Sequence, residues 1–344
     1  MVSGGRAAAM KISVLDQSPI SQGSTGADAL RNSLDLSRLA DRLGYTRYWV
    51  AEHHGTPMLA CASPEVLITA MGAATERIRI GSGGVMLPHY SPLKVAETFS
   101  IISALYPNRV DLGIGRAPGT DQTTAFALQR DRRQPSPDDF PNQLAELIAY
   151  LENKMPAGHP FARLAALPGR PFAPEVWLLG SSVQSALWAA DAGLPYCFAD
   201  FINPEGASYA GTYRERFSES DKWKEPQTIV ACFALCAETD EEAQRVASSA
   251  RMTRALLNEG RLIPVPTIET AQQFLKERGP NADSAVRPRR SIVGNPEKVK
   301  QGILELADLY GAGEVMILTN TYEHAARRRS YELIAEAFDL KAVQ

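Results

Sequence analysis

The chain has 344 residues, of which 44% are hydrophobic and 22% are charged, and its formal net charge is -3 at pH 7. This composition is ordinary for a soluble globular enzyme and excludes a chain that is disordered throughout. No apolar run is long enough to span a bilayer, so we expect no membrane association. Four cysteines without a framework spacing suit a reducing cytoplasm.

Acidic and basic residues are interspersed, and the sequence lacks the basic stripe that a phosphate backbone requires, so we expect no nucleic-acid partner. Basic clusters at 287–290 and 327–329 are more simply a solvated helix face or loop. The opening MVSGGRAAAM has no hydrophobic pattern and ends at a second Met. We interpret 1–10 as a cloning remnant or a disordered start, and 11–340 as one domain.

Short apolar runs alternate with longer helical patterns, which predicts βα units and a parallel sheet. Strands are expected at 12–15, 47–51, 78–83, 109–114, 175–179, 195–199, 227–235 and 314–318. Helices are expected at 26–43, 64–76, 91–105, 138–153, 182–192, 204–219, 238–255, 296–309 and 321–337. This order predicts an α/β fold, a single-domain (β/α)8 TIM barrel, with an insertion at about 256–295 between the seventh and eighth strands.

In such a barrel the active site is assembled at the C-terminal ends of the strands. Polar and glycine residues gather there, with Glu52-His53-His54 after the second strand, Gly83-Gly84 at the third, Arg116 after the fourth and Gly180-Ser181-Ser182 after the fifth. We therefore take these four segments as candidate site residues.

Gly180, Ser181 and Ser182 stand between a strand and a helix, where backbone N–H groups and hydroxyls can bind a phosphate. A serine that only caps the helix would give the same pattern. Arg116 on the neighbouring loop adds a guanidinium that can form paired hydrogen bonds with the same group. Together the two segments favour a phosphate or another anionic ligand.

His53 and His54 admit a metal site, an acid/base role or a purely structural role. Consecutive residues of an extended segment point to opposite faces, so only one imidazole is expected to face the barrel mouth. Of the other histidines only His89 is placed to join a metal site, and we expect no metal. An acid/base or hydrogen-bonding role for one histidine, supported by the other and by Glu52, fits better.

Gly83 and Gly84 follow a β-branched strand, and their lack of side chains lets a flat ligand approach the backbone closely. A simple β-bulge would have the same sequence.

Five segments taken together resemble a known family. They are EHH, GSGGVMLPHYSPLKVAE, YPNRVDLGIGRAPGTD, LLGSS and IVGNPEKVKQGILEL, and they occur in order over about 11–338. Each is weak alone, but jointly they resemble the bacterial luciferase-like, flavin-dependent monooxygenases, specifically the oxidoreductases with a GRAPG loop. Gly115 stands where some luciferases have a reactive cysteine, so light emission and aldehyde substrates are not expected.

The resemblance implies a TIM barrel that binds FMN at its C-terminal mouth. By residue match, Arg116, Gly180, Ser181 and Ser182 would hold the FMN phosphate, and His53 would be the catalytic histidine. Gly83-Gly84 falls where the family carries a non-proline cis peptide against the isoalloxazine.

The implied activity is oxygenation of a small organic substrate by O2 and reduced FMN through a flavin hydroperoxide. The resemblance also implies a separate NAD(P)H:flavin reductase as supplier of reduced FMN, and a homodimer. Two alternatives stay open, namely a non-catalytic flavin-binding protein and an oxidoreductase that uses F420 on the same barrel.

Overall fold

The computed structural model describes residues 10–116, 120–129, 139–164, 166–279 and 290–341. Nearly all of the start that we interpreted as a cloning remnant or disordered lies outside them. The described residues include nine strands in one parallel sheet: β1 (Lys11–Asp16), β2 (Arg47–Val50), β3 (Arg79–Met86), β4 (Val110–Gly115), β5 (Glu175–Gly180), β6 (Tyr196–Ala199), β7 (Thr228–Cys236), β8 (Ser291–Gly294) and β9 (Glu314–Leu318).

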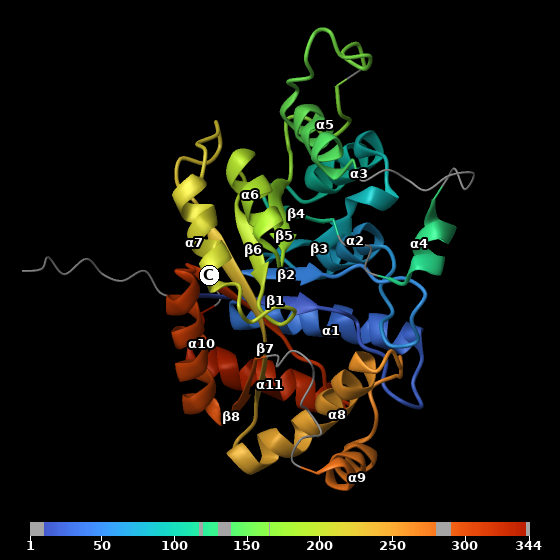
Figure 1. Ribbon diagram of the computed structural model, residues 1–344, viewed down its shortest axis with the longest axis vertical. Coiled ribbons are helices and arrows are strands. Elements are labelled where there is room, and N and C mark those ends of the chain that lie inside the picture. The colour runs from blue at the N-terminus through green and yellow to red at the C-terminus, as the bar shows by residue number, and fades with distance from the viewer. Residues whose placement is uncertain (1–9, 117–119, 130–138, 165, 280–289, 342–344) are drawn as a thin grey trace, which may run out of the picture.

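Eight of these strands close into a barrel. Each of β1 to β6 pairs with the next, β6 pairs with β7, β7 with β9, and β9 with β1. The predicted TIM barrel is therefore confirmed. Helices surround it (Figure 1): α1 (Gly26–Leu43), α2 (Pro64–Ala74), α3 (Pro92–Leu105), α5 (Phe140–Glu152), α6 (Val183–Asp191), α7 (Ala207–Arg216), α8 (Asp240–Asn258), α10 (Pro296–Tyr310) and α11 (His324–Ala337). Among the described residues, no helix is both long and apolar enough to cross a membrane.

The segment expected as an insertion at about 256–295 contains two elements that the sequence pattern did not predict, α9 (Ile268–Arg278) and β8. α9 packs beside α8 (Figure 1). β8 pairs with the end of β7, where Phe233 is aligned with both Ser291 and Leu318. β6 pairs only with the first part of β7, and β8 pairs with the last part of the same edge. Two short elements, η1 (Leu87–His89) and α4 (Gln122–Leu128), were also not predicted.

Side chains alternate between two apolar cores. Val14, Tyr48 and Ile80 point outward and pack under the helices. Leu15 and Trp49, one residue further along the same strands, point into the barrel. This period of two is the signature of a sheet buried on both faces.

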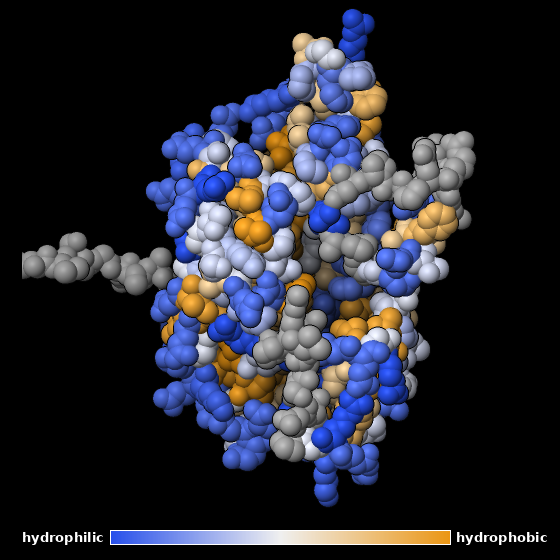
Figure 2. Space-filling model, viewed as in Figure 1, coloured by the Kyte–Doolittle hydropathy of each residue, from blue (hydrophilic) through white to orange (hydrophobic). Residues whose placement is uncertain are grey.

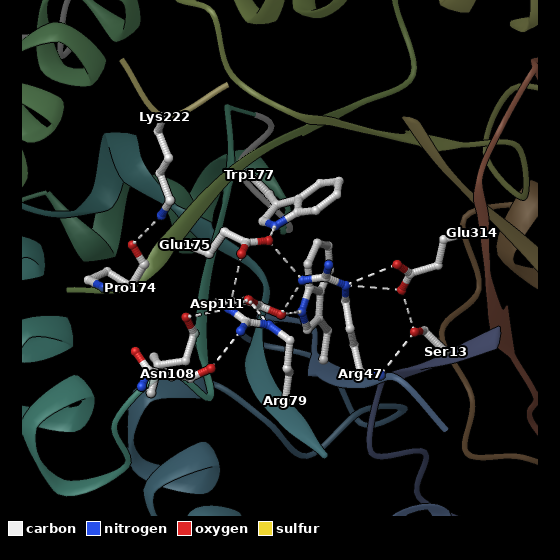
Figure 3. Close-up of polar contacts among 12 residues, drawn as sticks. Ser13, Arg47, Arg79, Asn108, Asp111, Pro174, Glu175, Trp177, Lys222 and Glu314 are labelled. Atoms are coloured by element: carbon white, nitrogen blue, oxygen red, sulfur yellow. Dashed lines mark hydrogen bonds and ion pairs between the residues drawn. The ribbon is translucent and has the colours of Figure 1, made fainter. Parts of the chain in front are cut away.

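The closed end of the barrel is filled by a buried cluster of charges (Figure 3). Arg47 donates to Asp111 at 2.9 Å, to Glu175 at 3.1 Å and to Glu314 at 3.0 Å. Arg79 also contacts Asp111. Burial opposes the charge on Arg47, but the three carboxylates outweigh it and raise the pKa of the guanidinium. Because these residues stand at the first or second position of their strands, one cluster links four strands to β2.

Above the charges lies a layer of tryptophans, and glycines make room for it. The rings of Trp49 and Trp177 meet edge to face at 5.6 Å, and the indole N–H of Trp49 donates to Asp111 at 2.8 Å. A Cβ on Gly81 would lie 2.9 Å from Trp49, closer than van der Waals contact allows. Glycine on β3 is thus the partner of tryptophan on β2.

We predict that Arg47→Met lowers the free energy of unfolding by about 3–5 kcal/mol, because it leaves buried carboxylates without their cation. Urea denaturation measures this change. Arg31→Met is the matched control, because Arg31 pairs with Asp28 at an exposed site and should cost at most about 1 kcal/mol. Equal losses for the two variants would show that the cluster does not stabilise the barrel.

Candidate active site

A cavity of about 470 Å³ lies at the C-terminal ends of the strands. Its wall includes Gln17 after β1, His53 and His54 after β2, and Leu318 and Asn320 at the end of β9. In the space-filling view hydrophobic side chains gather near the middle of the molecule, whereas the periphery is mostly hydrophilic (Figure 2). The volume is within the range of small-molecule sites.

Both His53 and His54 are among the residues that line this cavity, and our prediction that only one imidazole faces the mouth rested on a strand alternation that does not apply to them. The physical reason is that β2 ends at Val50. Residues beyond it are not in a strand, and the alternation of side chains does not apply to them. The two imidazoles differ instead in their hydrogen bonds.

His54 is held by Glu52, whose side chain is fully buried. The His54 Nε2 lies 2.7 Å from Glu52 Oε1, and the backbone N–H of Met86 donates to Glu52 Oε2 at 3.1 Å. The His54 carbonyl accepts a bond from Thr120 at 2.8 Å. Glu52 therefore connects the end of β2 to the end of β3 and fixes His54, as expected for a supporting residue.

His53 is held by its backbone, with its N–H donating to Cys61 O at 2.9 Å, and its side-chain Nδ1 has no hydrogen-bond partner among the described residues. Burial, and to a smaller degree the neighbouring His54, lower the pKa of His53 from 6.5 to about 4. The imidazole is therefore neutral at pH 7. A neutral imidazole has one ring nitrogen that donates a hydrogen bond and one that accepts, and the tautomer decides which of the two Nδ1 is.

Arg116 and α6 lie together on another side of the mouth. β4 and β5 are paired up to Ile114 and Leu178, which places the loops that follow them side by side. Arg116 is exposed, and its guanidinium carbon lies 5.5 Å from the ring centre of Trp188 in α6. The structure thus brings Arg116 close to the helix that Ser182 begins, as the sequence predicted.

The three residues before α6 have different roles. Ser182 is the N-cap of α6, and its side chain accepts a hydrogen bond from the backbone N–H of Ser185 at 3.3 Å. This is the helix-capping role that we gave as the alternative to phosphate binding. Gly180 has no room for a side chain, because a Cβ there would lie 2.1 Å from Ser185 Oγ. The Ser181 carbonyl accepts a bond from Asn203 at 3.0 Å, whereas its hydroxyl has no partner among the described residues. Ser181 is thus the serine with a donor to offer a ligand.

The peptide between Gly83 and Gly84 is cis, as the resemblance implied. A Cβ on Gly83 would lie 2.7 Å from Leu15 and 3.0 Å from Trp49, so the position faces the top of the barrel interior. A Cβ on Gly84 would lie 2.7 Å from the carbonyl oxygen of Gly113. Neither glycine, nor Arg116 or the residues before α6, lines the cavity that His53 lines. The predicted site residues thus fall into two neighbouring groups.

Several residues of the cavity wall were not predicted. Arg254 of α8 and Arg290 line it, although the cluster at 287–290 was interpreted as a solvated face or loop. Of the second cluster, Arg327 is buried and bonded to Asp16 at 2.6 Å, which corrects the same interpretation. Nothing in local sequence marks these arginines, because their partners are distant in the chain.

The sequence matches the model of a known family, described as luciferase-like monooxygenase, over residues 10–313. The chain belongs to this family. It is 43% identical over 335 residues to the protein YwcH of Bacillus subtilis (strain 168), covering 96% of this chain and 99% of that one. It is 36% identical to the N-acetyl-S-alkylcysteine monooxygenase of the same organism, covering 95% and 98%. The prediction of a luciferase-like oxidoreductase is confirmed.

Among solved structures, apo-MsnO8 is 40% identical, with a TM-score of 0.88 and coverage of 97% of this chain and 98% of that one. More distant solved structures share the fold alone. They include the oxygenating constituent of 3,6-diketocamphane monooxygenase from Pseudomonas putida in complex with FMN, at 19% identity, TM-score 0.73 and coverage of 98% and 100%. Another is an F420-dependent secondary alcohol dehydrogenase, at 13% identity, TM-score 0.69 and coverage of 96% and 99%.

We predict that the imidazole of His53 in this luciferase-like monooxygenase titrates near pH 4 by histidine NMR, with its signals assigned by their loss in His53→Gln. The urea-unfolded chain is the control, where the midpoint should be about 6.5. The unfolded state then binds this proton first as pH falls, so His53 lowers stability between pH 6.5 and 4 and leaves it unchanged above. A folded-state midpoint near 6.5 would contradict the neutral imidazole.

Proposed function

We propose that this chain is a flavin-dependent monooxygenase that uses reduced FMN, supplied by a separate NAD(P)H:flavin reductase, and O2 to oxygenate a small organic substrate. In the balanced reaction one oxygen atom enters the substrate and the other leaves as water, while reduced FMN becomes oxidised. The observation that carries the proposal is His53, with a lowered pKa, in the wall of a cavity at the C-terminal ends of the strands.

The donors at the mouth fit the phosphate of FMN. Arg116 is exposed and contacts Trp188 of α6, the Ser181 hydroxyl has no partner among the described residues, and the positive N-terminal end of α6 directly follows Ser182. Gly83 and Gly84 leave the barrel top without side chains where a flat ring would lie. Bound reduced FMN would supply the electrons that activate O2.

The chain's own residues would orient the ligands and manage a proton. The neutral imidazole of His53 can hold a hydrogen bond from a reacting group, or take its proton, at the ring nitrogen that carries no proton. Glu52 keeps His54 fixed beside it. Apolar residues of the cavity wall exclude water from the reacting groups.

A homodimer is the second part of the proposal. Val66 on α2 and Ile101 and Leu105 on α3 are apolar side chains that are 68%, 49% and 57% exposed, and the two helices are in contact. Large apolar side chains that are this exposed on neighbouring helices are typical of a protein interface. Sedimentation velocity of the purified chain tests it, and a monomer at micromolar concentration would refute it.

We predict that Arg116→Ala weakens FMN binding but leaves riboflavin binding almost unchanged, because only FMN carries the phosphate. Loss of one partner of a charge pair costs roughly 2–5 kcal/mol when the pair is buried and less at an exposed site. Fluorescence titration under anaerobic conditions with both flavins measures the contrast. Ser181→Ala should show the same contrast to a smaller degree.

If Arg116→Ala weakens both flavins alike, Arg116 is structural and the phosphate binds elsewhere. If the wild type binds neither flavin but binds F420, the F420 alternative replaces the proposal.

We predict that His53→Ala keeps FMN binding, because the phosphate donors follow β4 and β5, and lowers product formation by roughly 10²–10⁴-fold. His54→Ala is the matched control and should lose less, since Glu52 already engages its Nε2. Thioethers are the first substrates to try, because one relative is named for N-acetyl-S-alkylcysteines. The sulfoxide formed from chemically reduced FMN, O2 and N-acetyl-S-benzylcysteine is measured by mass spectrometry.

Wild-type product yield in His53→Ala would remove His53 from the chemistry. Flavin binding by the wild type without turnover of any thioether or ketone tried would favour the non-catalytic flavin-binding alternative.

A further inference from the structure

The cavity wall is mainly apolar but contains two arginines. Arg254 projects from α8, and Arg290 comes from the segment before β8. The apolar part of the wall includes Met58, Leu59, Phe201, Phe233, Leu257 and Leu318. A few charged groups in an apolar pocket commonly fix the orientation of a ligand. The two arginines therefore indicate which chemical group the ligand carries.

Arg290 is held in place from behind. Its Nε lies 3.4 Å from Asp200 Oδ1, and its Nη2 donates to the carbonyl of Pro204 at 3.3 Å. Asp200 is fully buried and accepts the hydroxyl of Tyr310 at 2.9 Å, which fixes the carboxylate. Within the described part of the chain, no protein group accepts a bond from the Nη1 of Arg290. That end of the guanidinium has donors to offer a ligand in the cavity.

Arg254 is placed by the helical repeat of α8. Ala250, four residues before it, and Leu257, three residues after it, line the same cavity, so this face of the helix forms the wall. The Arg254 guanidinium carbon lies 5.4 Å from the ring centre of Phe233. This contact keeps the cation beside the apolar wall of the cavity.

Other charges in the wall do not cancel this arrangement. Asp121 also lines the cavity, but its carboxylate accepts the backbone N–H groups of Thr123 and Thr124 and caps α4. Asp200 supports Arg290 from behind and is not part of the wall. Among the described residues of the wall, the charged side chains that we assign to this end are therefore the two arginines.

The arginines and His53 lie on opposite sides of the mouth. Arg290 pairs with Asp200 directly after β6, and His53 follows β2. In the eight-stranded ring, β6 and β2 are four strands apart in either direction. A ligand bound by Arg290 would thus extend across the cavity toward His53.

We propose that the cavity binds organic molecules with an apolar body and a carboxylate, that Arg290 and Arg254 bind the carboxylate, and that the apolar body extends toward His53. Asp200 is a positioning residue for Arg290. The assignment of this ligand as the oxygenated substrate rests on the proposed function, but the preference for a carboxylate does not.

The test compares N-acetyl-S-benzylcysteine with its carboxamide, which has the same shape without the charge. Binding to the purified full chain is measured by isothermal titration without flavin. We expect the acid to bind about tenfold more tightly than the carboxamide, because bonds to an ionised group are stronger. Arg290→Met and Arg254→Met should each reduce the preference at least threefold.

Arg245→Met is the matched control, because Arg245 is on the same helix but pairs with Glu242 outside the cavity. It should keep the full preference. Asp200→Asn should weaken the preference while keeping Arg290, since it removes the charge that holds the guanidinium. Thermal unfolding of each variant shows whether it is still folded. Only the acid preference of the folded variants is used to test the proposal.

Three results would overturn the proposal. One is equal binding of acid and carboxamide, or binding of neither, by the wild type. Another is an unchanged preference in both cavity variants. The third is a loss of FMN binding without loss of riboflavin binding in Arg290→Met, which would assign this arginine to the flavin phosphate. Failure of the wild type to bind FMN would refute the proposed function instead, and the carboxylate preference would be unaffected.

Discussion

The guanidinium of Arg47 contacts carboxylates from three other strands, Asp111, Glu175 and Glu314. A charge removed from water is costly unless partners with good geometry surround it, so each strand must begin at the level where its carboxylate reaches the same cation. A slip of one residue would turn these side chains outward, away from Arg47. The cluster thus couples the register of the strands to one interaction. It also closes one end of the barrel, and the cavity lies at the other.

Above this cluster, the size of the side chains differs from one side of the barrel to the other. Trp49 and Trp177 fill the interior, and β3 accommodates Trp49 with Gly81, whereas a Cβ on Gly113 of β4 would meet the backbone of Ser82 and the side chain of Leu179. Further along β3, Gly83 and Gly84 also have no side chain, so this part of the mouth contains little side-chain volume. On the other side α8 adds bulky residues to the cavity wall. The cavity therefore extends along the α8 side of the mouth, and Gly83 and Gly84 do not line it.

Much of the fold could be predicted because local pattern and tertiary structure agree. The helix expected at 26–43 has those bounds, since Thr25 and Asp28 form a capping box and Gly44 ends the helix in a left-handed conformation. β8 escaped prediction because it lies at the end of a stretch rich in Pro, Arg and Asn, which we interpreted as an insertion. Its position depends on an edge of β7 that only the closed barrel leaves open.

Site residues that directly follow a strand could be predicted from the sequence, whereas those held by distant partners could not. Strand ends mark the residues that follow them, so His53, Arg116 and Ser181 could be located from the sequence. Arg290 could not, because its position depends on Asp200 and Tyr310, which lie far away in the chain. Arg327 shows the same limit, since a basic run on a helix gives no sign that one member will pair with buried Asp16. Long-range charge pairs are invisible to local patterns.

The lowered pKa of His53 follows from the same arrangement and alters its chemistry. An imidazole in water with a pKa of 6.5 would be roughly one quarter protonated at pH 7, and one with a pKa of about 4 is protonated only about once in a thousand molecules. Burial among apolar groups causes most of this shift, and His54 adds to it. Because Glu52 binds His54 and not His53, its carboxylate does not restore the proton. The adjacent histidines thus differ through one hydrogen bond, because Glu52 binds His54, whereas Nδ1 of His53 is buried without a partner among the described residues.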